Sequence, residues 1–149
     1  MFIDALLLLS DAQAVTADAY STNTLDLGNV TPKRQVGSGE PLEVVVAVDV
    51  AADFTTGDET YAFLLVQSAN ADLSSHETIA TYTILAATLV AGYIFRIPIP
   101  PGFPTLRYLG LRFDVGGTSP TITVTAAVQP TSMASLRVPV AYADAITIS

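Results

Sequence analysis

The sequence predicts an all-β protein, an antiparallel jelly-roll β-sandwich of about eight strands with extended N- and C-terminal arms. Strand-length runs alternate apolar and polar residues, and glycine- and proline-rich breakers separate these runs. Lysine, glutamine and glutamate, which usually cover the outside of helices, are few. Half of the 149 residues are apolar, which is enough for one domain with a core. We expect a single domain over 1–149, with an N-terminal strand or arm (1–20), a sandwich (21–129) and a C-terminal edge strand or arm (130–149).

The N-terminal region is predicted to contribute one strand. The segment 3–9 is short and mostly apolar, so we expect it to form either a core strand or an arm that pairs with a neighbour. Residues 12–19 could form a short helix. The four leucines at 6–9 resemble an export signal only weakly, because no Lys or Arg precedes them and Asp4 stands where positive charge is expected. No apolar run approaches the roughly 18 residues of a membrane span, and we expect a protein made in a cytoplasm.

Seven further runs are predicted to be strands of the sandwich. The clearest alternation lies in residues 42–50, 107–115 and 121–129, and weaker alternation lies in 22–28, 60–68, 78–85 and 92–99. In 42–50 the even positions are all Leu or Val, while the odd face is only mildly polar. The inward faces of the last two clear runs are Leu109, Leu111, Phe113 and Val115, and Ile122, Val124, Ala126 and Val128. After Pro130, residues 136–142 alternate around a proline and predict an edge strand or an arm.

The sequence predicts no catalytic, cofactor-binding or metal-binding residues. His76 is the only histidine, cysteine is absent, and no Gly-x-Ser-x-Gly motif occurs. The carboxylates Asp49, Asp53, Asp58 and Glu59 gather near one strand end and turn, where solvated side chains are the favoured interpretation and a calcium site is the alternative. Six basic residues against fourteen acidic ones argue against a nucleic-acid partner. A single turn could be capped by residues 74–77.

A glycan- or surface-binding β-sandwich is the alternative function that the composition leaves open. Such modules use exposed aromatic platforms, but the chain has no tryptophan and its six tyrosines are spread over separate predicted strands. Cross-strand packing is the simpler interpretation of these tyrosines.

A protein partner is the favoured interpretation of a sequence with only 13% charged residues. Most of the arginines fall in or beside predicted strands, and arginine suits interfaces, although pairing with carboxylates of the same chain is the competing interpretation. The excess of acid predicts a basic surface on the partner. The candidate interface residues are Phe2, Ile3, Leu6 and Leu7 at the N-terminal end, with Arg96, Arg107, Arg112, Arg137 and Tyr142.

Several segments, taken in order, carry a resemblance to a known family. They are IDAL (3–6), SDAQAVT (10–16), STNTLDLG (21–28), GSGEPL (37–42), IPIPPG (97–102) and RYLGLRF (107–113). The sequence resembles the jelly-roll capsid cement, or decoration, proteins of short-tailed bacteriophages, of the Bordetella-phage type. The resemblance spans nearly the whole chain up to about residue 129.

The resemblance implies a structural virion protein without enzymatic activity or cofactors. It implies one jelly roll per subunit, bound to the outside of an icosahedral shell that a different protein, the major capsid protein, builds. The protein would be made in the host cytoplasm and would stabilise contacts between capsomers. Its partners would be the major capsid protein and a second copy of itself, as a homodimer rather than a trimer, without nucleic acid or membrane.

Overall fold

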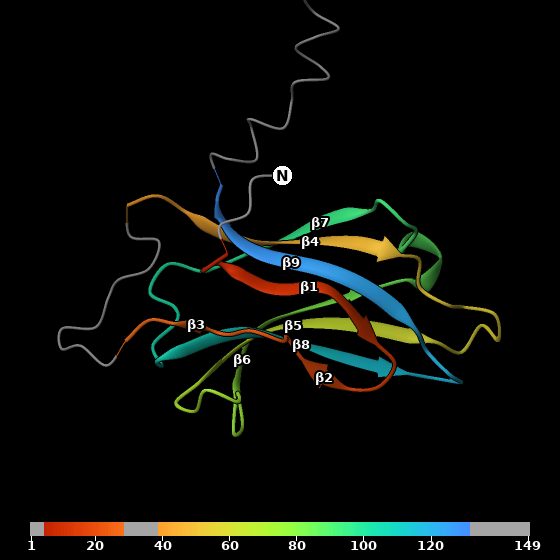
Figure 1. Ribbon diagram of the computed structural model, residues 1–149, viewed down its shortest axis with the longest axis horizontal. Coiled ribbons are helices and arrows are strands. Elements are labelled where there is room, and N and C mark those ends of the chain that lie inside the picture. The colour runs from red at the N-terminus through yellow and green to blue at the C-terminus, as the bar shows by residue number, and fades with distance from the viewer. Residues whose placement is uncertain (1–4, 29–38, 132–149) are drawn as a thin grey trace, which may run out of the picture.

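The computed structural model describes residues 5–28 and 39–131 (Figure 1). These ranges contain nine strands and one 3₁₀ turn. No helix in them is long and apolar enough to cross a membrane. The elements are β1 (Leu8–Val15), β2 (Ala19–Tyr20), β3 (Leu25–Asp26), β4 (Leu42–Val50), β5 (Thr60–Ser68), β6 (Glu77–Ile84), η1 (Ala86–Thr88), β7 (Ile94–Pro98), β8 (Tyr108–Gly116) and β9 (Ile122–Pro130).

The strands form two antiparallel sheets that stack as two layers (Figure 1). The first sheet has the order β1-β9-β4-β7. The second has the order β2-β8-β5-β6, with β3 also paired to β8. Because β2 and β3 pair with successive parts of β8, at Ala19↔Phe113 and Leu25↔Leu109, they act as one interrupted strand. Eight strands that alternate between two sheets in this order form a jelly roll, and the predicted fold class is confirmed.

The core lies between the sheets and consists of the inward faces that the alternation predicts. On β8 and β9, Leu109, Leu111, Phe113 and the four alternate residues from Ile122 to Val128 are buried in one cluster. Phe63 of β5 belongs to this cluster, and its ring makes edge-to-face contacts with Phe95 and Phe113 at ring-centre distances of 4.8 Å and 5.9 Å.

Three sequence predictions are wrong in detail: the bounds of the N-terminal strand, the short helix over 12–19 and the inward position of Val50. The N-terminal strand begins at Leu8 and runs to Val15, so no helix covers residues 12–19. Two register shifts in the β1–β9 pairing and a positive φ of 43° at Ala12 interrupt the alternation that would reveal this strand. Val50, placed on the inward face, is exposed because the register shifts between Val48 and Val50. Ile3 and residues 136–142 lie outside the described residues.

The loop between β5 and β6 folds over the outer face of the second sheet. Leu73 is fully buried there, and its Cδ1 lies 2.5 Å from the position that a Cβ on Gly110 would occupy. Only glycine leaves room for this approach. The loop is held by hydrogen bonds from the Ser68 hydroxyl to the carbonyl oxygen of Ser74 (2.7 Å) and from the amide of Ser74 to Asp72 (2.9 Å). It contains no helical turn, because Glu77 already begins β6.

Candidate interaction surface

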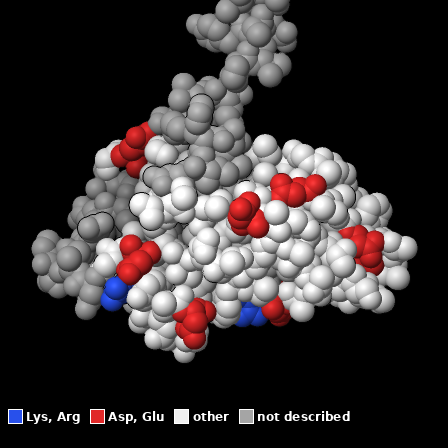
Figure 2. Space-filling view, in the orientation of Figure 1, with Lys and Arg blue, Asp and Glu red and all other residues white. Residues whose placement is uncertain are grey.

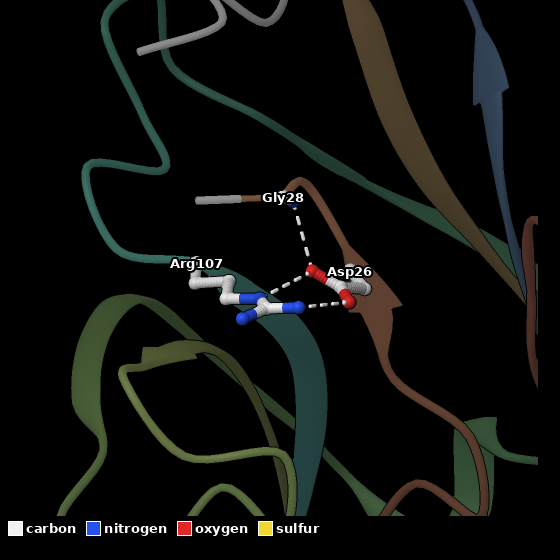
Figure 3. Close-up of polar contacts among 3 residues, drawn as sticks. All are labelled: Asp26, Gly28 and Arg107. Atoms are coloured by element: carbon white, nitrogen blue, oxygen red, sulfur yellow. Dashed lines mark hydrogen bonds and ion pairs between the residues drawn. The ribbon is translucent and has the colours of Figure 1, made fainter. Parts of the chain in front are cut away.

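Arg107, a predicted interface residue, is held by Asp26 of β3. Its Nε donates to Oδ1 of Asp26 (2.8 Å) and its Nη2 to Oδ2 (2.9 Å), while the amide of Gly28 donates to the same Oδ1 (2.8 Å; Figure 3). These contacts hold the pKa of Asp26 at about 2, below the ordinary 3.8, with the Arg107 hydrogen bonds as the largest cause. The pair closes the end of β3 onto β8 at the molecular surface.

Arg112 lies in a second network on the outer face of the same sheet. Its Nη2 is 3.3 Å from Oδ2 of Asp18, and its guanidinium lies 5.8 Å from the ring centre of Tyr20. The Tyr20 hydroxyl shares a 2.8 Å hydrogen bond with Nδ1 of His76. The backbone amide of Val115 also donates to Asp18 (3.0 Å), and this bond is the largest cause of the lowered pKa of Asp18. The single histidine therefore has a structural partner.

Arg96 of β7 pairs with a buried carboxylate on β4. Its Nε lies 3.3 Å from Oε1 of Glu43, which also accepts a hydrogen bond from Nε2 of Gln129 (3.0 Å). Each arginine of the described ranges thus makes an ion pair within the chain, as the competing interpretation expected, and each stays partly exposed. A role for these arginines at an interface stays a prediction.

The predicted N-terminal interface residues divide between the surface and the core. Leu6 is 82% exposed. Leu7 packs against the core cluster, and its carbonyl oxygen accepts a hydrogen bond from the amide of Val128 (2.9 Å). The remaining candidates, Phe2, Ile3, Arg137 and Tyr142, lie outside the described residues.

The carboxylates between β4 and β5 are bound by turn residues. Asp58 accepts from the amide (3.1 Å) and hydroxyl (3.0 Å) of Thr118 in the β8–β9 turn, and Glu59 accepts from the Thr56 hydroxyl and the amide of Gly57 (2.9 Å). Hydrogen bonds from the Thr56 hydroxyl are the largest cause of the lowered pKa of both carboxyls. Within residues 5–28 and 39–131, no group of three His, Asp or Glu side chains is placed to hold a metal ion.

The described surface is strongly acidic. Its ranges contain three arginines against twelve Asp and Glu residues. Figure 2 shows acidic side chains distributed over one face, and the basic atoms visible there lie beside acidic ones. Since each described arginine already pairs with a carboxylate, the remaining field of this surface is negative.

Exposed apolar side chains gather on a side of the sandwich that the sequence reasoning did not single out. We call it the β6–β7 side: the edge of β6, the connection through η1, the start of β7, the adjoining end of β4 and the residues 51–54 that follow it. The connection is tied to β4 by hydrogen bonds from Ala52 to Leu89 and from Gly92 to Val48, both 2.8 Å. The sequence contains one indication of this side, because the run 78–85 has no charged residue. The exposed apolar residues of this side are Val50, Phe54, Tyr82, Leu85, Val90 and Ile94.

Comparison with protein families matches residues 9–129 to the Bbp16 family. The match begins at the second residue of β1 and ends one residue before the end of β9, so it includes all but the two outermost residues of the nine strands. No curated protein matches the chain.

Proposed function

We propose, since this chain belongs to the Bbp16 family of capsid cement proteins of Bordetella phage BPP-1 type, that it binds the outside of an icosahedral phage shell and stabilises contacts between capsomers. The observation that carries the proposal is the family match over 9–129, which covers both sheets of the jelly roll. Attachment to the major capsid protein, a place on the virion surface and self-association as a homodimer belong to the same proposal.

The proposed mechanism requires only binding energy and involves no chemical reaction. A protein that binds the assembled shell but not its separated parts raises the free energy of capsomer separation, because separation must also break its contacts. Many modest contacts suffice, since a shell presents many equivalent sites. The buried core, which includes the Phe63 ring contacts, supports a rigid body that can transmit such contacts.

The charge of the protein supports a basic binding surface on the shell. With twelve carboxylates against three paired arginines in the described ranges, approach to a second acidic surface would be unfavourable. Attachment should therefore weaken as salt screens the attraction over the Debye length of roughly 10 Å at 0.1 M.

The alternative, a glycan-binding module, receives little support from the tyrosines. Tyr61 is fully buried, and its hydroxyl donates to the carbonyl oxygen of Asp53 (2.7 Å). The Tyr20 hydroxyl shares a hydrogen bond with His76, and Tyr93 packs against the core beside Phe95. These three rings are used in packing and do not form an open platform.

Co-sedimentation with shells tests the proposed attachment. The purified protein is mixed with assembled shells that lack it and, separately, with dissociated capsomers, at salt concentrations from about 0.05 to 0.5 M. We expect saturable binding to shells, weak binding to capsomers and lower affinity at high salt. Equal binding to both, or no binding at any salt concentration, would contradict the proposal. An unrelated acidic protein of similar size is the control for nonspecific attraction.

A further inference from the structure

The edges of the two sheets differ in how they are protected against pairing with another strand. An open edge presents unpaired backbone N–H and C=O groups, which natural proteins shield with bulges, charges, prolines or short strands. β1 carries two register shifts and the positive φ of Ala12. β7 has five residues, contains Arg96 and ends at Pro98. β2 and β3 have two residues each. These three edges are protected.

β6 has none of these devices along most of its length. It is the last strand of the second sheet, and within the described ranges its only strand partner is β5. One register shift lies near its start, and from Ala80 to Ile84 the pairing with β5 is regular. The run 78–85 contains no charge and no proline. Its threonines, isoleucines and tyrosine favour extended structure.

Several side chains along this edge are exposed and largely apolar, so an added strand could bury them. Tyr82 is 37% exposed and Leu85 is 79% exposed, although both are apolar in large part. Thr81, opposite Leu64 of β5, is exposed. Addition of a strand here would satisfy backbone groups and cover apolar surface at the same time.

We propose that β6 is a self-association surface, on which a second copy of this chain pairs its own β6 in antiparallel orientation about a two-fold axis at Thr81, so that the two Thr81 residues face each other. The two copies then share one continuous sheet in the order β2-β8-β5-β6-β6-β5-β8-β2. A two-fold axis at this point sets the uncharged run against itself, so no like charges lie opposite each other. The nearest carboxylate on the strand, Glu77, lies at the end of the run and is held by Nε2 of Gln67 (2.9 Å).

A second copy fits this edge better than it fits other parts of the acidic surface. Over most of the described surface, contact between two copies would bring carboxylates together, whereas β6 is uncharged from Thr78 onward. Threonine, isoleucine and tyrosine also form favourable cross-strand pairs. This inference gives a location to the self-association in the proposed function. Its test uses no shells, so loss of the dimer and loss of capsid binding are separate results.

The oligomeric state of charge variants tests the proposal. Sedimentation equilibrium of the full chain measures the dimer dissociation constant for the wild type, Thr81→Lys, and the matched control Ile94→Lys on the β7 edge. We expect a wild-type dimer, an increase of at least about tenfold in the dissociation constant for Thr81→Lys, and a wild-type value for Ile94→Lys. A mixture of Thr81→Lys and Thr81→Glu should recover the dimer, because opposite charges then meet across the axis.

Three results would overturn the proposal: a wild-type monomer up to about 1 mM, a Thr81→Lys dimer of wild-type affinity, or dissociation by Ile94→Lys alone. Thermal melting of each variant shows whether it is folded. If Thr81→Lys fails to fold, a second variant decides. The chain has no cysteine, so Thr81→Cys should form a disulfide-linked dimer under mild oxidation, since facing strand residues lie within disulfide reach. Ile94→Cys should stay monomeric, and the opposite pattern would place the contact on β7.

Discussion

The contact between Leu73 and Gly110 can be tested by a double-mutant cycle. Leu73 is fully buried beneath its own loop, and Leu-to-Ala changes at buried sites cost about 2–5 kcal/mol of unfolding free energy. Because the loop can partly collapse into the space, we expect about 2–3 kcal/mol for Leu73→Ala. A Cβ on Gly110 would lie 2.5 Å from Cδ1 of Leu73 and 3.1 Å from Oγ of Ser21. We expect Gly110→Ala to cost about 1–3 kcal/mol.

The double variant separates this contact from two independent effects. In Leu73→Ala/Gly110→Ala the new methyl group occupies space that the leucine has left, so the combined loss should be smaller than the sum by about 1–2 kcal/mol. The coupling is incomplete because Ser21 stays in place. Its hydroxyl donates to the carbonyl oxygen of Asn23 (2.8 Å) and accepts from the amide of Leu111 (3.1 Å).

Urea unfolding at neutral pH measures all four free energies, and melting temperatures give a second reading at roughly 2–4 °C per kcal/mol for a domain of this size. Val90→Ala, at a side chain that is 52% exposed and outside β6, is the control and should change stability by less than about 0.5 kcal/mol. Additive effects of the two single changes, within about 0.5 kcal/mol, would refute the claim that Leu73 occupies the space over Gly110.

Three further predictions follow from other contacts. Leu9→Ala should cost about 2–4 kcal/mol in urea unfolding, because Leu9 is a buried core residue; a change below about 0.5 kcal/mol would instead indicate a dispensable arm. Tyr61→Phe should cost about 1–2 kcal/mol, because its hydroxyl donates to the Asp53 carbonyl (2.7 Å) and accepts from the Thr121 amide (3.2 Å); an unchanged melting temperature would contradict this. The depressed pKa of Asp26 stabilises the fold above its unfolded value of 3.8, and that contribution is lost as the pH falls toward 2. Asp26→Asn should therefore reduce the dependence of the urea midpoint on pH between 4 and 2, and a slope identical to that of the wild type would contradict the assignment.

The central strands could be predicted from the sequence because each buries one face in the shared core. The predicted bounds of 42–50 and 60–68 coincide with β4 and β5, and those of the last two clear runs shift by a single residue at each end. The bounds of β1 could not be predicted in the same way, because its bulges break the two-residue alternation of apolar and polar residues. β2 and β3 are too short to show any period.

The surface could be predicted less well, because it depends on contacts between distant residues. The partners Asp26 and Arg107 are 81 residues apart, and Asp18 and Arg112 are 94 apart. Composition identifies such arginines as candidates, but only the fold brings a carboxylate to each. The placement of Leu73 over Gly110 likewise arises from packing of a loop on a sheet, which no local pattern encodes. The unprotected edge of β6 is different, because its uncharged run is visible in the sequence once its place at the edge is known.

Heating of phage particles with and without this protein tests the cement function most directly. Particles are stripped of the protein, the purified protein is added back at increasing concentration, and the temperature of genome release is measured. The account predicts that stripped particles release their genome at a lower temperature, and that added protein restores the original temperature in a saturable way as sites on the shell fill. If the stripped particles regain no stability when the sites are filled, the protein is not a cement protein.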